Sequence, residues 1–226
     1  MTKLVRTEVE AQEWLQDALC VSRETIAELD AFARFVTEEA ALQNLIAAST
    51  IDSIWQRHIV DSAQLLRFAQ PSAVSLWIDL GSGAGFPGLI IALLAPCRVV
   101  LIESRALRIA YLERAIARFG LKDRVEVAGM PLNRVKPTAA DFISARAFAP
   151  LPRLIEGAAR FSTDKTVWLL PKGRNARAEL ESVGAPWHDM FHVEPSITDS
   201  DAAILVGKGR IGVTEPKGAR PKRRHA

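Results

Sequence analysis

A glycine-rich run that begins with an acid is the stretch of this sequence whose residue types point most directly to chemistry. Residues 79–88 read DLGSGAGFPG, and they follow the apolar residues 76–78. Side chains are given up in this way where the backbone turns tightly or approaches a ligand closely. The Asp79 carboxylate beside such a turn would repel a pyrophosphate and attract an ammonium or sulfonium group. The run therefore favours a cationic cofactor at the end of a strand.

A second acid stands at the end of the next predicted strand. Glu103 follows the apolar residues 99–102, where a carboxylate can accept hydrogen bonds from both hydroxyls of a ribose. S-adenosylmethionine suits both acids, because it carries an amino group and a sulfonium but no phosphate. Two other interpretations stay open at this point. Residues 83–88 also match the G-x-G-x-x-G pattern of dinucleotide loops, and the two acids are also typical of a helix cap and a surface charge.

The elements that must position these residues change character near Pro71. Before it, helical periodicity extends from Arg23 to about Ala47, and a second helix is predicted from Asp52 or Ser53 to Pro71. After it, short apolar runs alternate with helical stretches, as in βαβ units. Strands are predicted at 76–80, 99–102, 125–127, 142–145 and 166–170, helices at 87–94, 105–119 and 151–160, and an antiparallel pair at 191–194 and 202–206.

This pattern predicts an α/β protein with a Rossmann-like fold, a mostly parallel sheet with an antiparallel edge strand. Residues 1–70 are predicted to form an N-terminal helical extension, 71–212 the Rossmann-like domain and 213–226 a basic tail. Residues 217–226 hold five Lys or Arg and no acid, while the rest of the chain has 24 basic and 26 acidic residues. Such a tail is typical of a disordered terminus that either aids solubility or contacts nucleic-acid phosphates.

Composition excludes several classes of protein. The 226 residues are 49% hydrophobic, which is enough for a sizeable core. The longest apolar stretch, 89–97, is interrupted by Pro96 and is too short to cross a bilayer. We recognise no signal or transit peptide and expect a cytoplasmic protein without a membrane anchor. Cys20 and Cys97 suggest no disulfide framework, and no metal site is expected because no Cys or His spacing is typical of one.

Five motifs of the chain together resemble those of one known family: RHIVDS at 57–62, DLGSGAGFPG at 79–88, IES at 102–104, SARAF at 144–148 and PKG at 171–173. They are similar to those of the glucose-inhibited division B family, bacterial 16S rRNA guanine-N7 methyltransferases, over roughly residues 25–210. The resemblance implies an S-adenosylmethionine-dependent methyltransferase whose partner is 16S rRNA or a precursor of the small ribosomal subunit, and we expect a monomer.

The resemblance also implies which residues contact the cofactor. The glycine motif would face the methionine part, Glu103 the ribose, and the segment at 132–133 the adenine. The family commonly has an acid where Asn133 stands, so a backbone contact or a neutral side-chain hydrogen bond is expected there. The implied cofactor-binding residues are Gly81, Gly83, Phe86, Glu103, Leu132, Asn133 and Arg146.

Methylation of guanine N7 makes modest chemical demands on the protein. N7 has an in-plane lone pair and no proton to lose, so it can attack the methyl carbon without a general base. Neither Cys20 nor Cys97 lies in a loop suited to a nucleophile of the kind that carbon methylation uses. Alignment of the reacting atoms remains as the main source of catalysis, and we assign no catalytic side chain.

Basic residues near the expected ligand edge are candidates for rRNA phosphates or the target base. Arg57, His58 and Asp61 share the second predicted helix, and Lys172 and Arg174 follow the fifth strand. From the residues alone, His58 and Asp61 also fit a helix-surface pair that packs the extension onto the sheet. Arg146 likewise fits a buried ion pair with Asp79 or another acid.

Three alternative functions stay open in the sequence. The first is a methyltransferase of a small molecule, the second a non-catalytic RNA-binding protein with a degenerate cofactor fold, and the third an NAD-dependent oxidoreductase. Stabilisation by S-adenosylhomocysteine but not by NAD would exclude the third, and methyl transfer into ribosomal RNA would exclude the other two.

Overall fold

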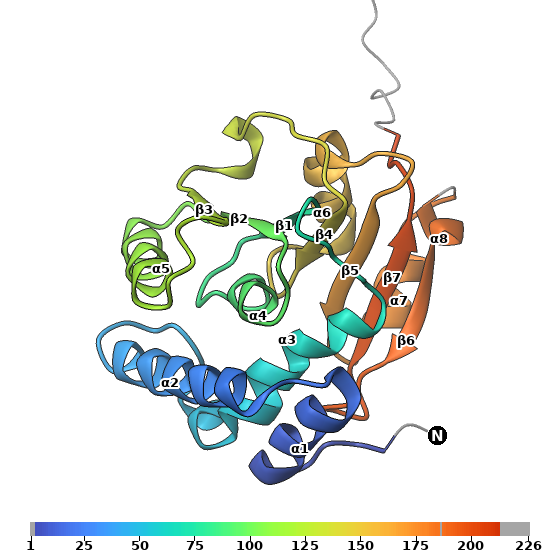
Figure 1. The fold of residues 1–226 in the computed structure, drawn as a ribbon. Helices are drawn as coiled ribbons and strands as arrows, with labels where there is room; N and C mark the ends of the chain where they lie inside the picture. The colour runs from blue at the N-terminus through green and yellow to red at the C-terminus, as the bar shows by residue number, and fades with distance from the viewer. Residues whose placement is uncertain (1–2, 186, 213–226) are drawn as a thin grey trace, which may run out of the picture.

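The computed structural model describes residues 3–185 and 187–212, which form a seven-stranded sheet with helices on both faces (Figure 1). The strand order is β3-β2-β1-β4-β5-β7-β6, so the sequential order reverses between β1 and β4. Such a reversal is where open α/β sheets bind ligands. The strands are β1 Leu76–Leu80, β2 Arg98–Ile102, β3 Val125–Ala128, β4 Phe142–Ala145, β5 Val167–Lys172, β6 Phe191–Pro195 and β7 Ala203–Lys208.

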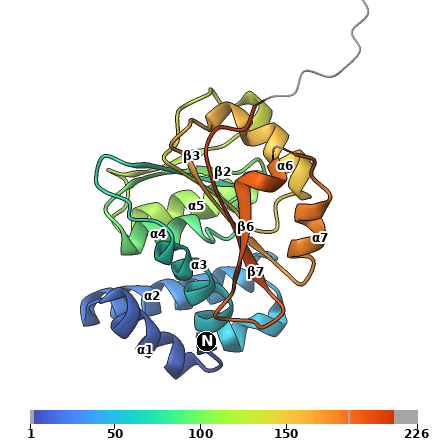
Figure 2. The same ribbon diagram turned by 90° about the vertical axis from the view of Figure 1, so that its right-hand side faces the viewer.

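The direction of the strands confirms the predicted fold class. The first five strands pair in parallel, while β7 is antiparallel to both of its neighbours, β5 and β6. Figure 2 shows β6 and β7 from their side of the sheet. The short connection between these two strands explains the antiparallel pairing, because a parallel pair would need a crossover of a dozen or more residues.

Helices cover the two faces of the sheet and bury two apolar clusters. One cluster joins side chains of α2, α4 and α5 to one face, and the other joins those of α6 and α7 to the opposite face. No helix among the described residues is long and apolar enough to cross a membrane. The helices that follow β1 are α4 Gly88–Leu94, α5 Ala106–Arg118, η4 Leu132–Arg134, α6 Leu151–Ala158, η5 Ala159–Phe161, α7 Ala176–Glu181 and α8 Trp187–Met190.

The chain before the sheet is helical and packs on the face where α4 lies (Figure 1). Its apolar side chains share one cluster with α4 and α5. The division of the chain at residue 70 stays a prediction, and the predicted basic tail lies outside the described residues. The helices of this segment are α1 Glu8–Leu19, α2 Arg23–Ala40, η1 Ala48–Ser53, η2 Trp55–Val60, α3 Asp61–Ala63 and η3 Gln64–Arg67.

Two sequence predictions for this segment need correction. The helix expected from Arg23 to about Ala47 ends at Ala40, and the next residues turn back so that Leu45 is buried in the core. The second predicted helix is not a regular α-helix: η1 and η3 are 3-10 turns, and η2 is a π-helix. Distant contacts hold the start of η2, because the Glu8 carboxylate accepts hydrogen bonds from the first two N–H groups of η2. Helical periodicity carries no sign of such contacts.

Candidate functional site

Two adjoining cavities open at the carboxyl ends of the parallel strands. The larger encloses about 1000 Å³ and lies between the ends of β1, β4 and β5, the helix η2 and the segment after β6. The smaller encloses about 160 Å³ and lies beside the end of β2. They share the walls Gly81, Arg105, Arg108, Ala147 and Phe148.

The glycine loop, residues 81–87, lines the larger cavity, and its first residue, Gly81, lines both cavities. Gly81 and Gly83 have φ values of 67° and 57°, a left-handed conformation that L side chains rarely adopt. A Cβ on Gly81 would overlap the ring of Phe148, and a Cβ on Gly83 would come within 3.3 Å of the Arg108 guanidinium. The loop therefore needs glycine for its backbone conformation and for close approach, as the motif predicts.

Asp79 does not face the cavities, which corrects its predicted role. The side chain is fully buried, and its Oδ1 accepts a hydrogen bond of 2.7 Å from Ser144 Oγ. Its Oδ2 accepts the N–H of Gly88, the first residue of α4, at 3.3 Å. Burial raises the pKa of Asp79 above its ordinary value. Asp79 thus anchors the start of α4, as the helix-cap interpretation proposed, and it lines neither cavity.

Glu103, which the sequence predicts to bind a ribose, lines the smaller cavity. The side chain is buried, and Oε2 accepts the Gly83 N–H at 3.1 Å, while Oε1 accepts the N–H groups of Ser104 and Arg105 at 2.7 and 3.0 Å. Each carboxylate oxygen can accept further hydrogen bonds. Glu103 therefore links the glycine loop to the end of β2 and still offers acceptors to a ligand.

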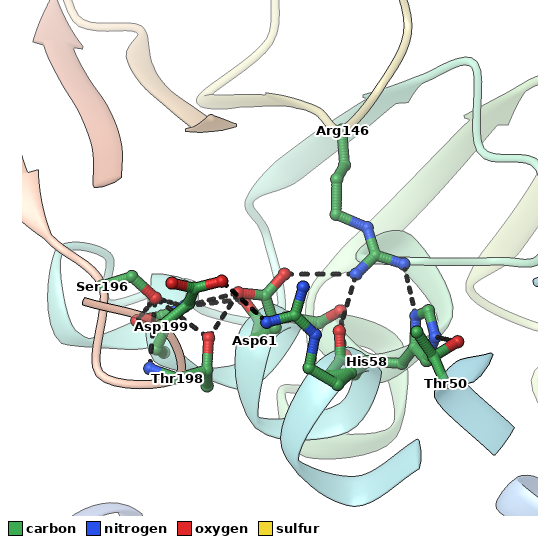
Figure 3. A network of polar contacts seen from close by, with 10 residues as sticks. Thr50, His58, Asp61, Arg146, Ser196, Thr198 and Asp199 are labelled. Carbon is green, nitrogen blue, oxygen red and sulfur yellow. Dashed lines mark hydrogen bonds and ion pairs between the residues drawn. The ribbon is translucent and has the colours of Figure 1, made fainter. Parts of the chain in front are cut away.

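Arg146 follows β4 and lies against the helix η2, as Figure 3 shows. Its Nη1 donates to Asp61 Oδ2 at 3.1 Å and to the Arg57 carbonyl oxygen at 3.2 Å, and its Nη2 bonds to His58 Nδ1 at 2.9 Å. The guanidinium also lies 5.1 Å from the centroid of the Phe86 ring. Arg146 is thus paired with an acid, as the sequence allowed, but with Asp61 and not with Asp79. We call these residues, Arg57, His58, Asp61 and Arg146, the arginine cluster.

The acid of this cluster continues into a second set of polar contacts. Asp61 Oδ1 accepts hydrogen bonds from Thr198 Oγ1 at 2.8 Å and from Gln64 Nε2 at 3.0 Å. Gln64 also bonds to the Ser196 hydroxyl. Figure 3 shows Ser196 and Thr198 beside Asp61. The segment after β6 is therefore tied to the helical segment before the sheet, and it forms one wall of the larger cavity.

The cations predicted to meet rRNA are partly neutralised within the chain. Arg57 pairs with Asp199 at 2.8 Å and Lys172 with Glu179 at 2.7 Å, and both cations line the larger cavity. Arg174 does not line either cavity. His58 and Asp61 make no hydrogen bond to each other; each instead bonds to Arg146, so the predicted direct pair is absent.

The structure brings most of the predicted cofactor residues together. Gly81, Gly83, Phe86 and Arg146 line the larger cavity, and Gly81, Glu103 and Leu132 line the smaller one. Asn133 lines neither cavity; its side chain is exposed and its carbonyl oxygen accepts a hydrogen bond from Arg160.

Sequence reasoning missed some residues that line the larger cavity. Phe148 falls within the SARAF motif, so its place after β4 was a usable signal. Thr50, Thr198 and Asp199 belong to no motif, and only the folded chain brings them to the cavity.

Comparison with known proteins places these features in a family. The chain is 53% identical to a ribosomal RNA small subunit methyltransferase G from Sphingopyxis alaskensis, over 92% of this chain and 89% of that protein. It is 50% identical to the protein of the same name from Rhizorhabdus wittichii, over 91% of this chain and 98% of that protein.

Solved structures share the fold at low sequence identity. A methyltransferase from Geobacter sulfurreducens is 18% identical, with a TM-score of 0.54, over 84% of this chain and 97% of that chain. A SAM dependent methyltransferase from Aquifex aeolicus is 16% identical, with a TM-score of 0.52, over 69% and 92%. The model of the GidB family, described as rRNA small subunit methyltransferase G, matches residues 25–197, and the chain belongs to that family, as its motifs predicted.

Proposed function

We propose that this chain transfers a methyl group from S-adenosylmethionine to N7 of a specific guanine in 16S rRNA. The observation that carries the proposal is the convergence of the glycine loop, Glu103 and Arg146 on two adjoining cavities at the strand-order reversal. The chain belongs to a family described as rRNA small subunit methyltransferase G. The larger cavity also exceeds what a cofactor tail needs, which leaves room for a base.

The residues present fit S-adenosylmethionine part by part. Glu103 offers carboxylate oxygens to the ribose hydroxyls, and Leu132 in the same cavity offers an apolar surface to the adenine. Gly81 and Gly83 line the larger cavity with backbone atoms alone, so a ligand there meets no side chain from these two residues. Three of the five N–H groups of Arg146 are used inside the arginine cluster, and the other two have no acceptor among the described residues. We assign those two to the α-carboxylate of the cofactor.

The chemistry asked of the chain itself is alignment and exclusion of water. When bound, S-adenosylmethionine supplies an electrophilic methyl group on a sulfonium. Guanine N7 offers its lone pair without losing a proton, so no side chain has to act as a base. Cys20 is exposed and Cys97 is buried with a raised pKa because of its burial, and neither lines a cavity. This arrangement supports attack by nitrogen and gives no support to a cysteine-dependent route.

The proposal also covers Asn133, the oligomeric state and the cellular location of the protein. We keep Asn133 as a backbone contact near the adenine, because its neighbour Leu132 lines the smaller cavity. The chain acts as a monomer in the cytoplasm, where bacterial rRNA is transcribed. Light scattering of the purified full chain gives its mass in solution and tests the oligomeric state.

The deciding experiment follows labelled methyl from S-adenosylmethionine into separate substrates. Naked 16S rRNA, assembled small subunits and a mixture of small-molecule acceptors are compared, and the product is mapped as 7-methylguanine. We expect label in one guanine of 16S rRNA and none in the small molecules. Label in a small molecule alone, or rRNA binding without transfer, would refute the proposal.

A matched pair of variants ties the reaction to this site. Glu103→Ala removes an acceptor from the smaller cavity, whereas Glu126→Ala removes a carboxylate from β3 that lines neither cavity. We expect transfer to fall in the first variant and to persist in the second.

A further inference from the structure

The three acceptors that hold Arg146 all come from the helical segment before the sheet. They are the Arg57 carbonyl oxygen, His58 Nδ1 and Asp61 Oδ2, supplied by η2 and by the first residue of α3. Figure 3 shows His58 and Asp61 beside Arg146. A guanidinium has donors only, so the nitrogen of His58 that meets it has to carry a lone pair and no proton. The contact at 2.9 Å therefore fixes Nδ1 as an acceptor.

The other ring nitrogen of His58 then carries the proton. His58 Nε2 lies 2.7 Å from Thr50 Oγ1, and the Thr50 hydroxyl donates in turn to the Ala47 carbonyl oxygen at 2.8 Å. The only consistent direction is from Nε2–H to Thr50 and from Thr50 to Ala47. Two independent contacts on opposite sides of the ring thus select the same tautomer.

The surroundings of the ring oppose a second proton. His58 is 9% exposed and stacks on the Phe86 ring, with centroids 5.0 Å apart. The charged groups around it are Arg146 from the end of β4 and Arg57 and Asp61 from its own helical segment, while Thr50 and Phe86 are neutral. Burial and the charges of the two arginines lower the pKa of His58 to about 3. A protonated ring would also leave Arg146 without one of its acceptors.

We propose that His58 is a positioning residue, a neutral imidazole with its proton on Nε2, which orients Arg146 so that the two remaining N–H groups can bind the carboxylate of the cofactor. The inference rests on the proposed function for the identity of that ligand. It assigns to the helical segment a part in cofactor binding, because Arg146 itself lies after β4 and its three acceptors do not. It also accounts for the position of Phe86 beneath both His58 and Arg146.

Two matched variants separate this role from simple packing. His58→Asn places a carbonyl oxygen near the Nδ1 position, within reach of Arg146, and His58→Gln places its polar group near the Nε2 position, beside Thr50. Loss of a hydrogen bond to a charged group is worth about tenfold or more in affinity. By calorimetry with S-adenosylhomocysteine, we expect His58→Asn to bind within about threefold of wild type and His58→Gln to lose about tenfold or more. The reverse order, or equal affinity in all three proteins, would overturn the inference.

Nitrogen NMR of the unaltered full chain gives a readout that does not depend on folding of a variant. With ¹⁵N-labelled histidine, we expect one ring with a pyridine-type Nδ1 and a pyrrole-type Nε2 that does not change between about pH 5 and about pH 8. The signal is assigned by its absence in His58→Asn, and if that variant does not fold, by its contact with Phe86. The opposite tautomer, or titration within that range, would overturn the inference. Failure of wild type to bind S-adenosylhomocysteine would instead refute the proposed cofactor.

Discussion

The glycine loop and the arginine cluster lie on the same cavity but are held in place by different means. The loop is fixed mainly by its backbone: Gly81 and Ser82 donate to the Ile102 carbonyl oxygen, and Asp79 and Glu103 accept backbone N–H groups. The arginine cluster is fixed mainly by side chains: Arg146 bonds to the side chains of His58 and Asp61 and to one backbone oxygen, that of Arg57, all from a helical segment far from Arg146 in sequence.

The difference teaches how each half of the site tolerates change. Backbone contacts depend on glycine conformation and on two buried acids, so few substitutions can keep the loop intact. Side-chain contacts can be replaced one at a time: substitution of His58 or of Asp61 removes one acceptor of Arg146 and leaves the other two, one of which is the backbone oxygen of Arg57. We therefore expect substitution of the acids that hold the loop to cost more stability or ligand affinity than substitution within the arginine cluster.

The largest expected effect comes from Asp79→Ala. It leaves the Ser144 hydroxyl and the Gly88 N–H without their acceptor in a fully buried place, and each such loss costs about 1–3 kcal/mol, so the free energy of unfolding should fall by about 2–6 kcal/mol. Urea denaturation followed by circular dichroism measures it. A variant as stable as wild type would show that the start of α4 is not anchored by this carboxylate.

Glu103→Ala should affect the ligand more than the fold. It removes the acceptor predicted for the ribose and releases the N–H groups of Gly83, Ser104 and Arg105, of which the last two belong to exposed residues. We expect the affinity for S-adenosylhomocysteine to fall by about 1.5–3 kcal/mol, as for other hydrogen bonds to a charged acceptor. Calorimetry gives the affinity, and filter binding of 16S rRNA serves as the control. Loss of rRNA affinity with retained cofactor affinity would contradict the ribose assignment.

Much of the fold was predictable because it depends on local patterns. The strands at 76–80 and 142–145 match the predicted bounds, and the antiparallel pair follows from a short connection. The π-helix Trp55–Val60 was not predictable, since its geometry depends on the Glu8 carboxylate and on contacts with Val5 and Thr198 that the sequence pattern does not express.

The site was predictable as a set of residues but not as an arrangement. The motifs named His58, Asp61 and Arg146, yet nothing in their spacing says that they meet. The role of Asp79 was misjudged because a strand-end acid beside a glycine loop can face either a ligand or a helix N-terminus. Only the register of β1 beside β4, which places Ser144 against Asp79, decides between the two.

The pH dependence of stability offers a smaller test within the arginine cluster. The ordinary pKa of histidine near 6.5 applies to the unfolded chain, and that of folded His58 is about 3, so below about pH 6.5 the unfolded state binds a proton that the folded state does not. The free energy of unfolding should therefore decrease as the pH is lowered, and this group should account for about 2 kcal/mol of the decrease from about pH 7 to about pH 5. The raised pKa of Asp79 changes the free energy of unfolding in the opposite direction as the pH is lowered. Wild type is therefore compared with His58→Asn, in which Asp79 is unchanged. That variant should show a shallower fall, and equal slopes would contradict a neutral buried ring.

The smallest effect is expected at the outer edge of the arginine cluster, in Asp199→Asn. Arg57 and Asp199 are 42% and 34% exposed, and exposed ion pairs contribute only about 0–1 kcal/mol. The hydrogen bond that the Arg57 side chain donates to Asp199 lowers the pKa of Asp199 and is partly solvated. Arg146 bonds instead to the carbonyl oxygen of Arg57, which this substitution leaves in place. Urea denaturation should therefore show a loss under about 1 kcal/mol. Because the substitution releases Arg57 from its acid at the wall of the larger cavity, affinity for 16S rRNA should rise at low salt, with Asp164→Asn, which lines neither cavity, as the matched control. If Asp199→Asn lost as much stability as Asp79→Ala, the exposed ion pair of Arg57 and Asp199 would stabilise the fold more than the buried contacts of His58 and Asp61, contrary to this prediction.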